Sequence, residues 1–210
     1  MIWKQVLDDE HTKHLKKLYK NGGTSFYCKE AFNSDQKFTS FKSYIPKNSK
    51  SKRAYRMEWE HIVAAENFGR AFKEWREGHP NCKNSKGEPF KGRRCARKRN
   101  LLFRQMEADP INLVPSIGEL NGLRSNYRFK TISSKENQFG TCNIKIENKS
   151  AEPPNHVKGD IARTYRYMEQ KYKVKIIGKS SRKLFLAWEK LDPLDKEECI
   201  RVKKHRIING

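Results

Sequence analysis

One stretch, residues 55–69, constrains the fold more than any other part of the chain. Between Tyr55 and Glu60, apolar and charged side chains alternate with a period of two, which predicts a half-buried strand. From residue 64 to residue 77 the apolar positions recur at spacings of three and four, which predicts a helix. The pair Glu60 and His61 lies where the two periods meet, so we expect it near the end of the strand.

The position of this pair bears on its chemistry. Neighbouring side chains inside a regular strand point to opposite faces, whereas at a strand end the chain can turn and bring Glu60 and His61 to one site. On the dipeptide alone, a surface carboxylate beside a hydrogen-bonded core histidine is at least as good an interpretation, because structural networks also hold such groups. Other segments must therefore decide between catalysis and structure.

The charge of the chain indicates the kind of partner. Its 210 residues contain 46 Lys and Arg against 24 Asp and Glu, a formal net charge of +22. Hydrophobic residues make up 35%, enough for a folded core rather than a basic disordered tail. The length suits one domain, with two small domains as an alternative. A polyanion is the expected partner, and both nucleic acid and an anionic membrane surface fit that description.

The chain has the features of a soluble protein, and a disulfide is plausible if it works in an oxidising compartment. No apolar run approaches the roughly 20 residues that span a bilayer, so we expect no membrane insertion. Residues 1–5 lack the apolar core of a signal peptide, so an exported protein would have lost its leader from this chain. The five cysteines form no Cys-x-x-Cys pair, which argues against a zinc ribbon. Cys82 and Cys95 bracket a basic loop that a disulfide would close, and at least one thiol must stay unpaired.

The most basic part of the chain follows the predicted helix, from His79 to Arg104. A run of this kind is usually only a solvated face. Here its attachment to the helix after Glu60 and His61 would put fixed positive charge beside that pair, so phosphate binding is the favoured interpretation.

A second polar group follows further along. Pro115 and Ser116 predict the start of a helix, on which Asn121 and Arg124 share one face. Asn121 and the adjacent Gly122 are poor helix residues, which suggests that a local need outweighs their low propensity. A helix C-cap at these two positions is nearly as good an interpretation.

Three further helices are predicted, over residues 6–18, 159–172 and 181–190. The aromatic residues between the cations of residues 37–56 are expected to anchor that segment to the core rather than to stack on bases. The basic tail, residues 201–206, is expected to be an exposed end.

These pieces fit the hydrolysis of a phosphodiester, which needs a nucleophile made from water and a cation on the developing charge. His61 can take the proton from water. Glu60 and Asn121 offer hard oxygen ligands to a Mg²⁺ that keeps several waters. A nearby arginine would hold the phosphate by paired hydrogen bonds.

Several long motifs also carry a family resemblance. They are Glu-Trp-Glu-His-Ile-Val (58–63), Met-Glu-Ala-Asp (106–109), Asn-Leu-Val-Pro-Ser-Ile-Gly-Glu-Leu-Asn-Gly-Leu-Arg-Ser-Asn-Tyr (112–127) and Ile-Ala-Arg-Thr-Tyr-Arg-Tyr-Met (161–168). In this order they closely resemble bacterial endonuclease I, a family of periplasmic or secreted non-specific nucleases with a ββα-metal (His-Me) finger. The resemblance covers essentially the whole chain.

The resemblance implies an α+β fold with one domain over residues 1–210 and a ββα-metal core at approximately 55–127. It implies that His61 is the general base, that Glu60 and Asn121 hold a single Mg²⁺, and that Glu107 orients the histidine. Mn²⁺ or Ca²⁺ would also suit the metal site. The implied reaction is cleavage of double- or single-stranded DNA, and of RNA in some members, leaving 5′-phosphates. We further expect a monomer, located in the periplasm or secreted.

The chain departs from the family at the arginine that binds phosphate, because Gly-His-Pro-Asn-Cys (78–82) stands where familiar members carry it. The remaining candidates for this role are Arg93, Arg97, Arg99 and Arg124, with His79 as a weaker one. A nucleic-acid-binding protein without catalysis is the alternative function, against which the intact Glu60, His61 and Asn121 argue. A basic toxin or membrane-surface protein has only charge in its support.

Overall fold

The computed structural model describes residue 13, residues 15–134 and residues 136–206. Its elements are β1 (Gly23–Thr24), β2 (Ala31–Phe32), β3 (Met57–His61), α2 (Ala65–Gly69), α3 (Lys73–Arg76), α4 (Arg93–Arg99), α5 (Leu101–Glu107), the 3-10 turn η1 (Pro110–Asn112), β4 (Leu113–Ile117), α6 (Gly118–Arg124), β5 (Arg128–Phe129), β6 (Lys145–Glu147), β7 (Ser150–Glu152), the 3-10 turn η2 (Asn155–Val157), α7 (Lys158–Tyr172), α8 (Lys179–Leu191) and α9 (Lys196–Arg206). This mixture of helices and small sheets confirms the predicted α+β class. Most of the helix predicted over residues 6–18 lies outside the described residues. Residues 15–18, which are described, are helical.

The centre of the fold is an antiparallel pair, β3 with β4, followed directly by α6. The register joins Glu58 to Ser116, Glu60 to Val114 and His61 to Leu113. The predicted strand is thus confirmed, and it ends at His61. Because Glu58 and Glu60 are two residues apart, both side chains lie on the same face of β3.

The helix predicted over residues 64–77 is wrong, because the chain forms two short helices there. α2 ends at Gly69, Phe72 is extended (φ −94°, ψ 139°), and α3 begins at Lys73. The break lets the ring of Trp75 pack onto Gly69, where an added Cβ would lie only 2.3 Å from the ring. Packing of the tryptophan therefore outweighs continuation of the helix.

The predicted start of the next helix at Pro115 and Ser116 is also wrong. Both residues belong to β4, which pairs only with β3 among the described strands and can therefore hold a proline. α6 begins at Gly118, with Ile117 extended before it (φ −64°, ψ 127°). Asn121 and Gly122 lie inside this helix, so the alternative of a C-cap at these residues is excluded.

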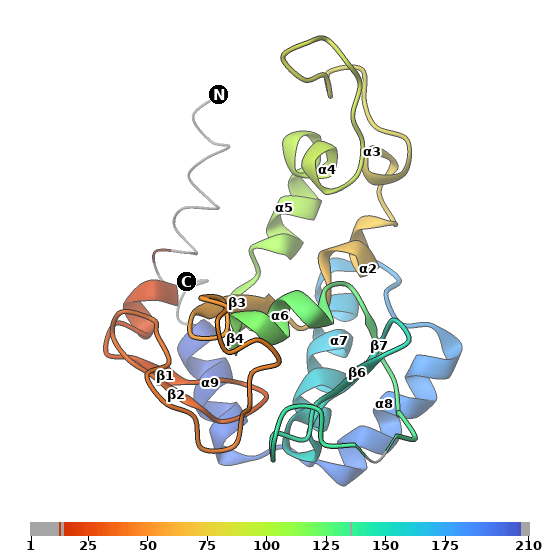
Figure 1. Cartoon of the computed structure of the whole chain (residues 1–210). Helices are drawn as coiled ribbons and strands as arrows, with labels where there is room; N and C mark the ends of the chain where they lie inside the picture. The colour runs from red at the N-terminus through yellow and green to blue at the C-terminus, as the bar shows by residue number, and fades with distance from the viewer. Residues whose placement is uncertain (1–12, 14, 135, 207–210) are drawn as a thin grey trace.

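Helices α3 and α4 form an arm that projects from the body (Figure 1). We define the arm as residues 70–100; α2 leads into it and α5 returns from it. A disulfide between Cys82 and Cys95 closes its outer loop, as the sequence predicts. Rings of Phe68, Phe72 and Trp75 pack around Phe103 of α5, with centroids 5.4–6.0 Å apart, and fix the base of the arm.

One hydrophobic cluster runs through the body, from Phe26 to Trp188. Helices α7 and α8 confirm the predictions for residues 159–172 and 181–190, and they pack against each other. The aromatic anchors expected in residues 37–56 are present, since Phe38 and Tyr44 are each 2% exposed. A second disulfide, which the sequence did not predict, joins Cys28 to Cys142, and Cys199 is a free, exposed thiol.

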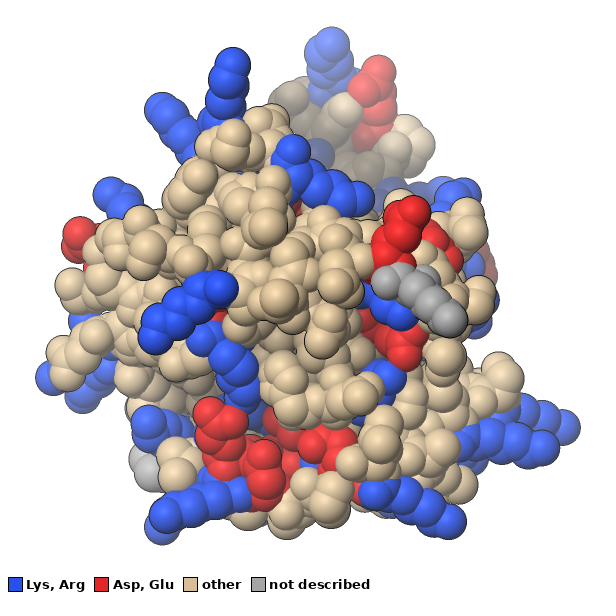
Figure 2. All heavy atoms as spheres, turned by 60° about the horizontal axis from the view of Figure 1, so that its bottom comes forward, with Lys and Arg blue, Asp and Glu red and all other residues tan. Residues whose placement is uncertain are grey.

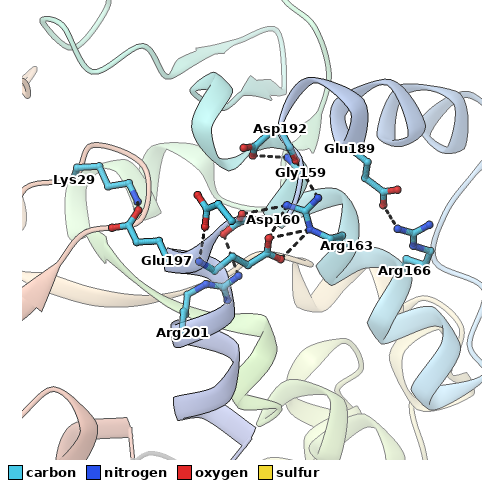
Figure 3. Close-up of polar contacts among 11 residues, drawn as sticks. Lys29, Gly159, Asp160, Arg163, Arg166, Glu189, Asp192, Glu197 and Arg201 are labelled. Atoms are coloured by element: carbon cyan, nitrogen blue, oxygen red, sulfur yellow. Dashed lines mark hydrogen bonds and ion pairs between the residues drawn. The ribbon is translucent and has the colours of Figure 1, made fainter.

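Polar contacts fasten α9 to α7, as Figure 3 shows for Arg163, Arg201 and Asp160. Arg163 donates to both oxygens of Glu198 (2.6–3.0 Å), and Arg201 Nη2 donates to Asp160 Oδ2 (3.2 Å). The tail is therefore not simply an exposed basic end: Arg201 is held by an ion pair, and His205 is fully buried.

On the face in Figure 2, Lys and Arg are scattered over a surface made mostly of other residues, while Asp and Glu gather in a few groups. Among the described residues, no helix combines the length and apolar composition that a bilayer span requires.

Candidate active site

Glu60 lies almost entirely inside the protein, with 1% of the residue exposed. Its Oε1 accepts hydrogen bonds from Arg124 Nη1 of α6 (2.9 Å) and from the hydroxyl of Tyr27 (3.0 Å). Burial raises the pKa of Glu60 to about 6, against the opposing effect of the Arg124 charge. Both contacts use the same oxygen, so Oε2 is the atom with coordination capacity to spare.

His61 is half-buried at the end of β3, and its Nε2 lies 2.8 Å from the main-chain carbonyl oxygen of Glu107. A carbonyl oxygen only accepts, so Nε2 carries the proton and Nδ1 keeps a free lone pair. Burial, together with the charge of Arg93, lowers the pKa of His61 to about 4. The imidazole is therefore neutral at pH 7 and can accept a proton at Nδ1.

The Glu107 carboxylate makes a separate set of contacts, with two arginines of α4. Arg93 Nε donates to Oε1 (2.5 Å), and Arg97 donates from Nε to Oε2 (2.7 Å) and from Nη2 to Oε1 (2.8 Å). Burial alone would raise the pKa of Glu107, but the two guanidinium groups lower it. The side chains of Arg93 and Arg97 are 48% and 49% exposed, so these two cations are fixed next to the histidine and still face solvent.

Asn121 reaches back from α6 to β3. Its Nδ2 lies 3.0 Å from Glu58 Oε2 and 3.4 Å from the carbonyl oxygen of Trp59. Arg124, one turn later, contacts Glu60 and the carbonyl oxygens of residues 61 and 62 (2.6–2.9 Å). The direct side-chain partner of Asn121 is Glu58, which lies two residues before Glu60 on the same face of β3.

The oxygen atoms of Glu60 and Asn121 have the chemistry that suits Mg²⁺. The described residues contain no cluster of three or more His, Cys, Asp and Glu of the kind that encloses a metal. Mg²⁺ does not need one, because it is usually held by one or two protein oxygens and keeps several waters. One Glu60 oxygen and the Asn121 amide oxygen are of the type that would serve as such ligands.

The remaining candidates lie elsewhere or point inward. His79 accepts a hydrogen bond from the backbone of Asn81 (3.1 Å) in the loop before α4, and Arg99 is exposed at the end of α4. Within the described part of the chain, neither contacts Glu60, His61 or Glu107. The Arg124 side chain is 1% exposed, and its guanidinium contacts the interior.

Sequence reasoning missed three residues of this site. Glu58 shares the period-two face of Glu60, which was a usable signal. Tyr27 and Arg53 gave no signal, because their contacts with Glu60 and Glu58 depend on how distant segments meet.

The groups around the end of β3 are those that a phosphate-ester hydrolase requires: a neutral imidazole, oxygen ligands and fixed arginines. A family model, Endonuclease I, matches residues 3–209, and the chain belongs to this family. It is 37% identical over 204 residues to a periplasmic deoxyribonuclease of Aeromonas hydrophila, covering 93% of this chain and 79% of the relative. It is 38% identical over 200 residues to Endonuclease-1 of Buchnera aphidicola subsp. Acyrthosiphon pisum, covering 92% and 74%.

A third relative, an extracellular deoxyribonuclease of Aeromonas hydrophila, is 35% identical over 204 residues, covering 93% of this chain and 81% of the relative. Two of these relatives are thus named for the periplasm or for the extracellular medium. The two disulfides of this chain fit the same oxidising compartments. The predicted periplasmic or secreted location is confirmed.

Proposed function

We propose that this protein is an endonuclease that hydrolyses phosphodiester bonds of DNA with His61 as general base. The observation that carries the proposal is the contact between His61 Nε2 and the Glu107 carbonyl oxygen, because it leaves Nδ1 as a fixed proton acceptor. Water that gives up its proton to Nδ1 attacks the phosphorus atom. The bond between phosphorus and the 3′-oxygen then breaks, the 3′-oxygen takes up a proton from water to become a hydroxyl, and a 5′-phosphate is left. The role of Glu107 here is to orient the histidine, through its backbone.

Glu60 and Asn121 are the residues that would hold the metal ion, with Mg²⁺ as the expected ion and Mn²⁺ or Ca²⁺ as substitutes. A bound divalent cation supplies positive charge that stabilises the negative charge of the transition state. Glu60 is ready for this role because Arg124 and Tyr27 fix its carboxylate without using Oε2. In this proposal β3, β4 and α6 form the ββα-metal finger.

Arg93 and Arg97 are the proposed phosphate contacts. Each side chain is about half exposed and anchored by Glu107, so the guanidinium groups present donors at a fixed place beside His61. Arg124 is a poorer candidate than the sequence suggested, because its side chain is 1% exposed and both of its terminal nitrogens donate inside the protein. Contacts to phosphates carry no base identity, so the proposed substrates include double- and single-stranded DNA and RNA. We also propose that residues 1–210 act as one domain and as a monomer.

Cleavage of supercoiled plasmid tests this function. The purified chain should nick and then fragment the plasmid with Mg²⁺, and it should do neither with an excess of chelator. The variant His61→Ala should cut at least about 10²-fold more slowly while it still binds DNA, because only the proton acceptor is removed. Arg99→Ala, which changes an exposed arginine at the end of α4, is the control variant and should cut like the parent.

Two results would contradict the proposal. Cutting by His61→Ala at the parental rate would exclude this histidine as the base. Tight, salt-sensitive DNA binding without any cleavage, under reducing and oxidising conditions alike, would favour a non-catalytic nucleic-acid-binding protein.

A further inference from the structure

Glu58 is the most heavily hydrogen-bonded carboxylate near the site, and the proposed reaction gives it no role. Arg53 donates from Nε to Oε1 (2.8 Å) and from Nη2 to Oε2 (2.7 Å), and Arg56 Nε donates to Oε1 (3.1 Å). Both carboxylate oxygens of Glu58 thus receive donors from arginine side chains, so Glu58 acts here as a hydrogen-bond acceptor.

Glu58 also determines which way the Asn121 amide points. A carboxamide has a donor end and an acceptor end that are almost equal in size, so its environment must select the orientation. Both neighbours of the amide, the Glu58 carboxylate and the Trp59 carbonyl oxygen, accept hydrogen bonds and donate none. The amide nitrogen must face them, and the oxygen must face away from them.

We propose that Glu58 is a positioning residue that keeps the oxygen of Asn121, and not its nitrogen, turned toward the metal ion. This inference rests on the proposed function, in which Asn121 is a metal ligand. The nitrogen of a carboxamide is not a ligand for Mg²⁺ or Mn²⁺, so a reversed amide would remove one of two protein ligands. Arg53 and Arg56 take part indirectly, because their hydrogen bonds hold the Glu58 carboxylate in place.

The two glycines of α6 support this inference independently of the hydrogen bonds. A Cβ at Gly118 would lie 2.8 Å from Glu58 Oε1, and one at Gly122 would lie 2.4 Å from Arg53 Nη1. Gly118 and Gly122 are four residues apart and thus share one face of the helix. This face of α6 carries no side chain at Gly118 and Gly122, which makes room for Glu58 and Arg53. The need for this room explains why a helix-weakening glycine follows Asn121.

Binding of Mn²⁺, added as MnCl₂ and measured by the loss of the free-ion EPR signal, tests the inference without any substrate. The variant Glu58→Gln brings a donor beside the amide and allows it to reverse. We expect binding about tenfold weaker than in the parent, the lower end of the range for outer-shell changes. Thermal unfolding by circular dichroism should show that the variant is folded.

The variant Asn121→Asp provides the control, because both ends of a carboxylate are oxygen atoms and either can bind the metal ion. In that background Glu58→Gln should strengthen Mn²⁺ binding, since it removes a contact between two negative groups and supplies a donor in its place. A merely structural role of Glu58 would weaken binding equally in both backgrounds, and that result would overturn the inference. If Glu58→Gln fails to fold, Arg53→Met is the substitute variant. It removes the hydrogen bonds of Arg53 to Glu58, and because the Arg53 side chain is 46% exposed, we expect the protein to tolerate the change. It should weaken binding by a smaller factor, and binding equal to that of the parent would overturn the inference.

Two further variants separate this inference from the proposed function. Glu60→Ala and Asn121→Ala should each lose Mn²⁺ binding. If both bind Mn²⁺ like the parent, the metal site itself is wrong. If both lose binding while Glu58→Gln binds like the parent, only the role of Glu58 is wrong.

Discussion

At the scale of single residues, Arg124 and Glu60 form a buried ion pair next to the site. The guanidinium also lies over the ring of Phe129, with Cζ 4.5 Å from the centroid. Replacing Arg124→Met leaves a buried carboxylate without its cation, so we expect the free energy of unfolding to fall by about 3–5 kcal/mol. Urea denaturation measures this change, and Arg128→Met, at an exposed arginine on β5, is the control. A loss below about 1 kcal/mol would show that Glu60 does not depend on Arg124.

His205 should make stability sensitive to acid. Its Nδ1 lies 2.6 Å from the Pro110 carbonyl oxygen, and burial lowers its pKa to about 4 from the ordinary 6.5. In the unfolded chain His205 therefore binds a proton below about pH 6.5, whereas in the folded protein it binds one only below about pH 4. The stability that depends on neutral His205 is complete above pH 6.5 and is lost as the pH falls toward 4.

This contribution amounts to about 3 kcal/mol, and His205→Gln should reduce the slope of stability against pH in that window. Urea denaturation at several pH values between 4 and 7 measures the slope. Part of it should persist in the variant, because His61 titrates in the same direction. An unchanged slope would show that His205 does not remain neutral in the folded protein.

At the scale of elements, the two disulfides should differ in strength. Cys28 and Cys142 are 114 positions apart, whereas Cys82 and Cys95 are 13 apart. Longer closed loops restrict the unfolded chain more, so removing the first bond should lower the free energy of unfolding by about 4–5 kcal/mol and removing the second by about 3 kcal/mol. Denaturation of the two paired Cys→Ala variants measures both, with Cys199→Ala as a near-neutral control. The opposite order would show that strain or residual unfolded structure outweighs loop length.

The sequence predicted elements well where one local pattern dominated, as in β3, α7 and α8. It failed where a contact between distant residues decided the outcome. The packing of Trp75 on Gly69 interrupts the helix predicted over residues 64–77. The pairing of β4 with β3 places Pro115 in a strand and not at the start of a helix. In the candidate site, chemistry alone pointed to Glu60, His61 and Asn121 in the sequence, but the pairing of Asn121 with Glu58 depends on how α6 crosses β3. No periodicity in the sequence contains that information.

At the scale of the whole molecule, the net charge of +22 should govern binding to nucleic acid. The affinity of His61→Ala for a short DNA duplex should fall steeply with salt, with a logarithmic slope of about −0.9 for each phosphate that is neutralised. Arg93→Ala or Arg97→Ala should make the slope smaller in magnitude by about 1, because each removes one proposed phosphate contact. Fluorescence anisotropy across a salt series measures the slope. If Arg99→Ala changed the salt slope more than Arg93→Ala or Arg97→Ala does, the phosphate contact would have to be assigned to Arg99 at the end of α4.

The arm has a consequence for how this protein could diversify. It is inserted between two strands that pair with each other, so His61 and Leu113 stay together whatever lies beyond them. Lengthening such an insertion raises the entropic cost of closing it only slowly, by about 0.6 kcal/mol for each doubling of its length. Its outer loop is also separated from the rest by the Cys82–Cys95 bond. The loop between Cys82 and Cys95 could therefore change in length while the pairing of β3 with β4 keeps His61 in place.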